Sequence, residues 1–260
     1  MAKKAFTLIE LLVVIAIIAV LMAILMPALR AAKDHARRIH CVANVQTLAL
    51  GWFMYKDDND DRLVRGHTGT TWEPDDWAHS AQNQQTLELK LEAIRDGALF
   101  PYVGKSVEVY RCPADLRLKH PNRFCYRSFS IANGANGENW PGDHIPAKKY
   151  SEIRRPATKY VFVEDIDPRG ENVGSWQINY TPAQWIDPLA MWHNQKTTLG
   201  FADGHSEMHK WHDKSFIDWC HTHMDASLYG TQYSFNMQPP ADEQEDYEYM
   251  ARGFPCRSHN

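Results

Sequence analysis

An apolar stretch near the N-terminus constrains this chain more than any other part of its sequence. It runs from Phe6 to Met26, and Glu10 is the one charged side chain between residues 6 and 29. A helix of roughly 20 apolar residues is long enough to cross the hydrocarbon core of a bilayer. The mean hydropathy of the whole chain, −0.50, is that of a soluble protein. The average therefore combines two different parts, a membrane-spanning segment and a polar remainder.

The charges around the apolar stretch predict its orientation. Lys3 and Lys4 precede it, and positively charged flanks stay on the cytoplasmic side, so everything after Arg30 is expected on the far side of the membrane. A cleaved secretory signal is the alternative, with an apolar region of about 7–15 residues and a small-x-small cleavage site. Here the run is longer and no clean Ala-x-Ala follows Met26. We therefore expect a single span in the inner membrane, with the remainder periplasmic or extracellular.

Glu10 lies inside this stretch and requires an explanation. An ionisable group within the hydrocarbon costs a few kcal/mol, so it indicates a functional site with a partner. The run Lys4-Ala5-Phe6-Thr7-Leu8-Ile9-Glu10-Leu11-Leu12-Val13-Val14 resembles the leader and cleavage motif of type IV pilins and type II secretion pseudopilins. The resemblance implies that a prepilin peptidase cuts between Ala5 and Phe6 and methylates the new amino terminus. Gly usually precedes the cut, so Ala5 implies slower processing. A plain uncleaved anchor is the alternative, but it gives no reason for Glu10.

Cleavage would create a charge that Glu10 can pair with. The new α-amino group lies about one helical turn from the carboxylate, and buried unlike charges require pairing. The resemblance implies that Glu10 pairs with the amino terminus of a neighbouring subunit, and that Pro27 loosens the helix on assembly. The implied partners are prepilin peptidase, other pilin or pseudopilin subunits, the inner-membrane assembly platform and membrane lipid. Removal of Lys3 and Lys4 leaves 28 − 2 = 26 basic against 32 acidic side chains, a net charge of −6.

Beyond Pro27 the apolar pattern becomes one-sided. Apolar positions recur at intervals of three and four, which predicts an amphipathic helix packed on a globular head. These positions are Leu29, Ala32, Ala36, Ile39, Ala43, Val45 or Gln46, Leu50 and Phe53. The helix is expected to run from Phe6 to about Tyr55 and to end at the acidic segment 57–61. We thus divide the chain into a leader (1–5), a pilin-type helix (6–56, with about 6–29 in the membrane) and an extracytoplasmic head (57–260).

The head has the composition of short strands separated by long loops. Segments 107–112, 128–132, 159–163 and 197–201 are typical of strands. Asp203-Gly204 between the last of these and 206–209 predicts a hairpin, and 84–95 is expected to be a helix that Asp96-Gly97 ends. The predicted class is α+β: a pilin-like long N-terminal helix packed on an antiparallel sheet with long loops.

A second resemblance concerns the head. Nine residues separate His193 from Asp203-Gly204, and this spacing is similar to the C-terminal signature of a pseudopilin-like family abundant in planctomycetes and lentisphaerae. Arg38-x-x-Cys41-x-x-Asn44 and the run Arg111-Cys112-Pro113-Ala114-Asp115 also resemble that family. An extended strand of about 30 Å between His193 and Asp203 makes direct contact unexpected. Each is expected to anchor its own loop, and a metal or ligand role is the alternative.

Two sets of side chains have a spacing that suits metal ions. His205, Glu207 and His209 would share one strand face, followed by His221-x-His223, as in a zinc site. Asp57-x-Asn59-x-Asp61 places oxygen donors at alternate positions, as in a calcium loop, although the Gly and distant Glu of an EF-hand are missing. Neither spacing is diagnostic, and a solvated surface and a helix stop are the simpler interpretations. We expect no cofactor, with calcium as the alternative.

The five cysteines suit an oxidising compartment, where two disulfides with one thiol left over are expected. They are Cys41, Cys112, Cys125, Cys220 and Cys256. The sequence does not determine their pairing. Cys112–Cys125 would close a short loop, and Cys220–Cys256 would tie down the C-terminal tail.

The tryptophans leave two interpretations open. Six of the nine lie in polar loops, as on a carbohydrate-binding surface, or they fill a loop-rich core, which we favour. The six are Trp72, Trp77, Trp140, Trp176, Trp185 and Trp192.

Other functional classes find little support. The chain contains no nucleophile elbow, phosphate loop, His-Glu-x-x-His helix or dinucleotide fingerprint. Glu164-Asp165 and Asp167 follow a predicted strand, where carboxylates are common, so no enzyme is predicted. A net charge of −4 gives no basic surface for nucleic acid.

The sequence therefore predicts a structural subunit, minor or tip, of a type II secretion pseudopilus or type IV pilus-like filament. The alternative is a membrane-anchored glycan- or metal-binding protein that uses a pilin-like helix for export. Secretion, adhesion and DNA uptake stay equally open.

Overall fold

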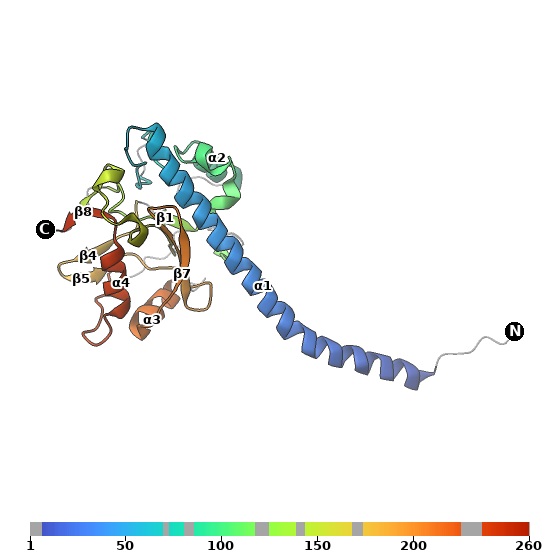
Figure 1. The fold of residues 1–260 in the computed structure, drawn as a ribbon. Coiled ribbons are helices and arrows are strands. Elements are labelled where there is room, and N and C mark those ends of the chain that lie inside the picture. The colour runs from blue at the N-terminus through green and yellow to red at the C-terminus, as the bar shows by residue number, and fades with distance from the viewer. Residues whose placement is uncertain are drawn as a thin grey trace.

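The computed structural model of the chain describes residues 7–69, 73–80, 86–117, 125–138, 144–167, 174–224 and 236–259. A long helix, α1 (Leu8–Asp58), projects from a head built around an antiparallel sheet (Figure 1). The predicted α+β class, with a long N-terminal helix on an antiparallel sheet, is confirmed and is consistent with a pilin-like fold.

Helix α1 has 51 residues, which corresponds to about 77 Å. It begins after Thr7, whose side chain accepts a hydrogen bond from the Glu10 N–H, and Asn59 caps its C-terminal end. Its most apolar 18-residue window has a mean hydropathy of 3.2, and none of it is buried within the fold. Length and composition therefore fit a membrane span. The part of α1 that extends away from the head is curved (Figure 1), and Pro27 lies within this exposed part.

Only part of the apolar stripe that we expected to pack on the head does so: Val45 is buried and Phe53 packs against the core, whereas the other predicted positions are exposed. The buried residues of the helix are Cys41, Asn44, Val45, Leu48, Ala49, Gly51, Trp52 and Tyr55. Ile39 and Leu50, from the predicted stripe, are 58% and 45% exposed. A helix turns by about 100° per residue, so a face displaced by two residues lies almost opposite. Both faces carry apolar side chains, and periodicity alone does not distinguish the one that meets the sheet.

Four strands form the central sheet: β1 (Phe129–Ile131), β3 (Tyr160–Glu164), β6 (Lys196–Phe201) and β7 (Ser206–Lys210). Their spatial order is β1-β3-β6-β7, and each neighbouring pair is antiparallel. The four segments match predicted strands. The predicted hairpin is also confirmed, because β6 pairs with β7 across a turn in which Gly204 has φ +93°.

The strand predicted at 107–112 is wrong. Val107–Tyr110 forms a 3-10 helix, η2, and no strand within the described part of the chain pairs with it. The carbonyl oxygens of Glu108 and Arg111 instead accept hydrogen bonds from the Asn44 side chain on α1. Helix packing thus provides the hydrogen bonds that a neighbouring strand would otherwise supply.

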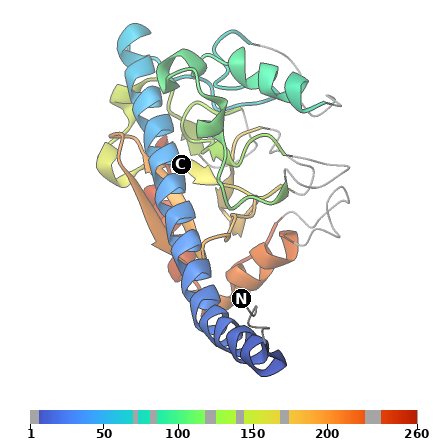
Figure 2. The same cartoon turned by 90° about the vertical axis from the view of Figure 1, so that its right-hand side faces the viewer.

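The remaining elements surround the sheet. The predicted second helix is present as α2 (Leu87–Arg95), and α3 (Lys214–His223) and α4 (Glu245–Gly253) follow later in the chain. Helices α2 and α3 lie at opposite ends of the head (Figures 1 and 2). Strands β2 (His144–Pro146) and β8 (Cys256–His259) form one small sheet, and β4 (Ile178–Tyr180) and β5 (Ala183–Trp185) form another. Short 3-10 helices occupy Phe100–Val103 (η1), Tyr150–Glu152 (η4) and Pro156–Thr158 (η5).

Helix α1 runs along one side of the head (Figure 2), in contact with β6, β7 and β3. Its buried face joins η1, η2 and part of the sheet in one hydrophobic cluster, and a second cluster joins the sheet to α3, α4 and β5. Trp77, Trp176 and Trp185 are fully buried, which confirms the core interpretation for these three. Trp192 is partly buried, and Trp72 and Trp140 lie outside the described residues.

Candidate functional site

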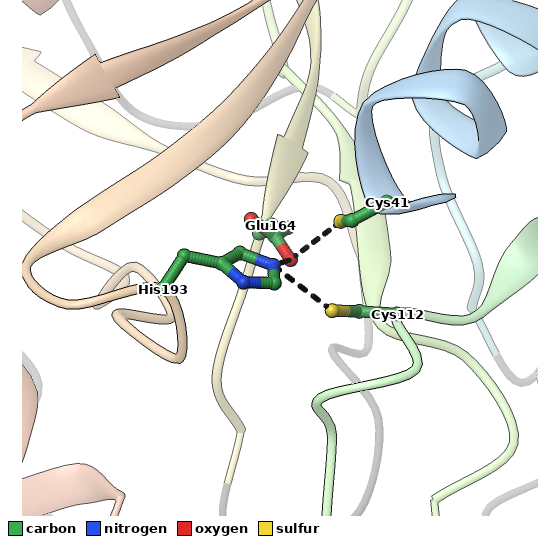
Figure 3. A group of neighbouring side chains, drawn as sticks. All are labelled: Cys41, Cys112, Glu164 and His193. Atoms are coloured by element: carbon green, nitrogen blue, oxygen red, sulfur yellow. Dashed lines mark hydrogen bonds and ion pairs between the residues drawn. The ribbon is translucent and has the colours of Figure 1, made fainter. Parts of the chain in front are cut away.

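Four side chains from four separate segments converge inside the head (Figure 3). Cys41 comes from α1, Cys112 from the loop after η2, Glu164 from the end of β3 and His193 from the loop before β6. Their donor atoms all lie within 4.8 Å of one another. All four residues are buried, and His193 is the most exposed at 4%.

The contacts within the cluster centre on one ring nitrogen and one carboxylate oxygen. His193 Nε2 lies 3.2 Å from Cys112 Sγ and 3.3 Å from Glu164 Oε1. Cys41 Sγ donates a hydrogen bond of 2.9 Å to the same Oε1. A nucleophilic triad needs its nucleophile and its carboxylate on opposite nitrogens of the imidazole. Here Cys112 Sγ and Glu164 Oε1 both lie next to Nε2 of His193. The four side chains therefore converge on one point and are not arranged as a proton relay.

Neighbouring groups orient these donors. The Thr198 N–H donates to Glu164 Oε2 over 2.7 Å, and the Thr198 hydroxyl lies 3.4 Å from Cys41 Sγ as a donor. The Ala114 N–H donates to Cys112 Sγ over 3.4 Å. Each sulfur and the carboxylate are thus held by a hydrogen bond from outside the cluster.

The electrostatics of the cluster follow from burial and from the charges within it. Burial raises the pKa of the Cys41 thiol, and the neighbouring Cys112 and Glu164 raise it further. Burial alone would raise the pKa of Glu164, but its hydrogen bond and charge interaction with His193 bring it below the ordinary value. Burial alone would lower the pKa of His193, whereas Cys112 and Glu164 raise it to about 10. Without an ion, the cluster is a buried imidazolium–carboxylate pair beside two thiols.

Two further contacts hold the Cys112 loop in place. Asn44, one turn after Cys41, donates to Arg111 O over 2.8 Å. Asp115 forms a buried ion pair with Arg117, in which Nη2 and Oδ2 are 2.9 Å apart. The first contact joins the Cys112 loop to α1, and the second holds the loop from its other end.

The two ends of the His193 to Asp203-Gly204 signature lie in different parts of the head. His193 belongs to the cluster, while Asp203 and Gly204 form the β6–β7 turn, where Asp203 Oδ1 is 2.5 Å from His205 Nδ1. The sequence marked His193, Cys41 and Cys112 separately but did not identify Glu164 as their common partner. Only the tertiary packing of α1, β3 and two loops brings the four together.

The predicted zinc set on β7 does not share one point. His205 stacks on Phe201, with ring centroids 4.3 Å apart. Glu207 Oε1 accepts a hydrogen bond from Tyr249 Oη over 2.9 Å, and His209 stacks on that tyrosine ring. These side chains line a surface around Tyr249 and are not arranged around an ion.

The acidic segment after α1 closes the helix. Asn59 Nδ2 donates to Tyr55 O over 2.7 Å, Asp57 forms an ion pair with Lys56, and Asp61 Oδ2 accepts from the Ser151 N–H over 3.1 Å. The arrangement agrees with a helix stop, and calcium binding there stays a prediction.

Neither suggested disulfide is present, because none of the five cysteines forms a disulfide bond in the structure. Cys112 faces His193, whereas Cys125 donates from Sγ to the carbonyl oxygen of Arg127. Cys220 lies in α3 and accepts a hydrogen bond from the Leu189 N–H, while Cys256 lies in β8. Sequence separation suggested the pairs, but the sulfurs of Cys112, Cys125 and Cys220 each contact a different neighbour.

At the N-terminus, Glu10 forms a capping box. Its Oε2 accepts hydrogen bonds of 2.8 Å from both the N–H and the hydroxyl of Thr7. Ala5 and Phe6, the predicted cleavage residues, lie outside the described residues. The single chain therefore holds the Glu10 carboxylate at the first turn of α1, next to the position where processing would create an amino terminus.

Comparison with known families identifies this same region. Residues 1–26 match the family model of the prokaryotic N-terminal methylation motif, which is consistent with a prepilin-type pilin or pseudopilin. The match confirms the N-terminal resemblance and does not extend into the head. Comparison with curated proteins gives no match, and neither does comparison with solved structures.

Proposed function

We propose that this chain is a non-enzymatic structural subunit, minor or tip, of a type II secretion pseudopilus or a type IV pilus-like filament. The methylation motif at residues 1–26 carries the proposal. It lies at the start of a helix whose apolar window is not buried against the head. Prepilin peptidase, other pilin-type subunits, the inner-membrane assembly platform and membrane lipid are its proposed partners.

The exposed half of α1 supports assembly through the helix. Large apolar side chains between Leu8 and Leu29 are about half exposed or more, for example 74% at Ile9 and 69% at Ile24. Apolar surface on this scale requires a lipid or protein environment, since burial stabilises by about 25 cal/mol per Å². Lipid provides it before assembly, and the helices of neighbouring subunits provide it in a filament core.

The head supports a minor or tip position. Residues 57–260 are more than a helix-bundling subunit requires, and its described part has its own two-cluster core. We place the N-terminus in the cytoplasm, because Lys3 and Lys4 precede the apolar segment. The head then lies in the periplasm or outside the cell.

The amino terminus of the native protein tests the proposal. Mass spectrometry of chain extracted from membranes that contain an active prepilin peptidase should find an N-methylated Phe6. The same chain beside an inactive peptidase should retain Met1. Ala5→Gly should be processed faster, because it restores the residue usual before the cut. An intact Met1 beside active peptidase, or a start near Lys33, would overturn the proposal.

The second candidate is a metal-binding head that α1 exports and anchors. The buried cluster of Cys41, Cys112, Glu164 and His193 favours it. A glycan-binding surface is less favoured, because Trp77, Trp176 and Trp185 are fully buried. Filament assembly and metal binding are compatible in one subunit.

A further inference from the structure

We propose that Cys41, Cys112, Glu164 and His193 bind one divalent transition-metal ion of the zinc type, and that this ion fastens α1 to the head. The inference rests on the cluster alone and does not depend on filament assembly.

The spacing of the donor atoms suits a tetrahedral ion. Zinc lies about 2.3 Å from sulfur and about 2.0–2.1 Å from nitrogen or oxygen, so tetrahedral donors are about 3.3–3.8 Å apart. The observed separations are 3.3 Å for Nε2 to Oε1, 3.2 Å for Nε2 to Cys112 Sγ and 2.9 Å for Cys41 Sγ to Oε1. The first pair already has tetrahedral spacing, and the two pairs that include sulfur need outward shifts of roughly 0.3–0.7 Å. The remaining donor pairs lie within 4.8 Å of one another. In Figure 3 the four side chains point toward one another from different elements.

The chemistry of the donors selects the class of metal. Two thiols, an imidazole and a carboxylate suit zinc and related transition metals, whereas calcium and magnesium prefer oxygen donors throughout. Four protein donors fill a tetrahedral coordination sphere, and burial excludes water from it. Such a site is structural, because a catalytic zinc retains one open position.

The surrounding hydrogen bonds resemble those that support metal ligands. Metal-bound sulfur and carboxylate groups are commonly oriented by outer donors. Here the Ala114 N–H reaches Cys112 Sγ, and Thr198 reaches both Glu164 Oε2 and Cys41 Sγ. The donors are therefore held in place by the backbone of a loop and by the backbone and hydroxyl of Thr198 on β6.

Two metal-free explanations account for fewer of the contacts. In a hydrogen-bonded cluster, the single hydrogen on His193 Nε2 would have to serve both Cys112 and Glu164. In an oxidised cluster, a Cys41–Cys112 disulfide would involve only the two sulfurs. It would not explain why Glu164 and His193 converge on them. One ion engages all four donors together.

The position of the cluster in the fold gives the ion a mechanical role. Cys41 is the first buried residue along the described part of α1, and residues 8–36 before it are exposed. The ion would join the helix, where it leaves the head, to β3 and to two loops. A force along α1 would then reach the sheet through metal–ligand bonds as well as through apolar packing.

The metal content of the full-length chain tests the proposal. Chain purified in detergent without chelators should contain close to one zinc per molecule by inductively coupled plasma mass spectrometry. Cys112→Ser should lose this zinc, while the serine can still bond to the Ala114 N–H and to His193, which favours retention of the fold. Cys125→Ser is the matched control, because Cys125 is also buried but bonds to Arg127; it should retain the zinc.

A second measurement needs no variant. After removal of zinc by a chelator, added Co²⁺ should give the visible bands and near-ultraviolet sulfur-to-metal transitions of a tetrahedral cobalt–thiolate site. Wild-type chain that carries no metal above the buffer blank and gives no such spectrum would overturn the proposal. So would a Cys41–Cys112 disulfide in the native protein by peptide mass spectrometry, or a Cys112→Ser variant that keeps its zinc.

Discussion

Gly200 of β6 lies directly against Val45 of α1. A Cβ atom on Gly200 would be 2.7 Å from Val45 Cγ1 and 3.3 Å from the Cβ of Ala49. The absent side chain allows the helix to approach the sheet closely. This approach also brings Cys41, one turn before Val45, to the end of β3 where Glu164 lies.

Gly200→Ala should therefore destabilise the head. Val45 is β-branched and has little freedom at χ1, so α1 must move away from the sheet to accept the methyl group. Overpacking of this kind typically costs about 1–3 kcal/mol. The free energy of unfolding, measured by denaturant titration of the full chain in detergent, should fall by that amount.

Gly104→Asn is the matched control for this substitution. Gly104 has φ +68°, which Asn tolerates, and a Cβ there has no neighbour within 4 Å. Its effect should stay within about 0.5 kcal/mol. Equal losses for the two variants would show that the contact with Val45 does not limit the approach of α1.

The parts of the fold that local signals encode were predictable. Helix α1 and the β6–β7 hairpin follow from a long apolar run and from Asp203-Gly204, whose effects act within a few residues. The strands of the central sheet carry the same kind of local signal. The end of α1 near Asp58 also follows locally, from the acidic segment that cannot continue an apolar face.

The parts that depend on tertiary packing were not predictable. Ile39 and Cys41 lie on nearly opposite faces of α1, and the face that carries Cys41 is the one that approaches Gly200 of the sheet closely. Segment 107–112 has strand composition, yet Asn44 of α1 binds its carbonyl groups. Glu164 resembles any acidic residue at a strand end until α1 and the His193 loop pack around it.

Glu10 has a local role that must be separated from its proposed role in assembly. Its carboxylate caps the first turn of α1 through Thr7. Glu10→Gln can preserve this cap, because Gln also serves at the third position of a capping box, but it removes the charge. Glu10→Ala removes both. If charge pairing drives assembly, both variants should insert into the membrane and both should fail to enter filaments recovered by shearing.

Membrane fractionation controls for insertion in that experiment. A Glu10→Gln variant that assembles like wild type, beside a Glu10→Ala variant that does not, would mean that the cap and not the charge is required. The pairing hypothesis predicts equal defects in the two variants.

The Asp115–Arg117 pair should be among the most sensitive sites in the head. Both side chains are 1% exposed, and Arg117 also donates to the carbonyl oxygen of Asp167. Removing one partner of a buried ion pair leaves an uncompensated charge and costs about 3–5 kcal/mol. Asp115→Asn should lower the free energy of unfolding on that scale, and adding Arg117→Met should recover part of the loss.

An exposed pair provides the comparison. Glu88 and Arg95 are paired on α2, with side chains 66% and 40% exposed. Surface pairs contribute about 0–1 kcal/mol, so Glu88→Gln should have a small effect. A loss below about 1 kcal/mol for Asp115→Asn would contradict the assignment of the buried pair as a stabilising element of the Cys112 loop.

Asp187 gives the head a dependence on pH. It is buried, and its Oδ2 accepts a hydrogen bond of 2.9 Å from the Gln177 N–H. Burial raises the pKa of Asp187 well above its ordinary value, and the negative charges of Asp167, Asp165 and Glu138 raise it further. The folded chain therefore keeps a proton on this carboxyl at pH values where the unfolded chain has lost it.

Asp187→Asn should remove this dependence. The unfolded carboxyl loses its proton near its ordinary pKa of 3.8, so the unfolded state binds fewer protons above that pH and the stability of the folded state falls as pH rises toward the folded pKa. Asn keeps an oxygen for the Gln177 N–H and has no proton to lose. The Tm of Asp187→Asn should equal that of wild type below pH 3.8 and exceed it at neutral pH. The control is Asp34→Asn, on the exposed part of α1, whose Tm should equal that of wild type at both pH values. A difference between Asp187→Asn and wild type that is the same at acid and neutral pH would mean that Asp187 is ionised in the folded protein.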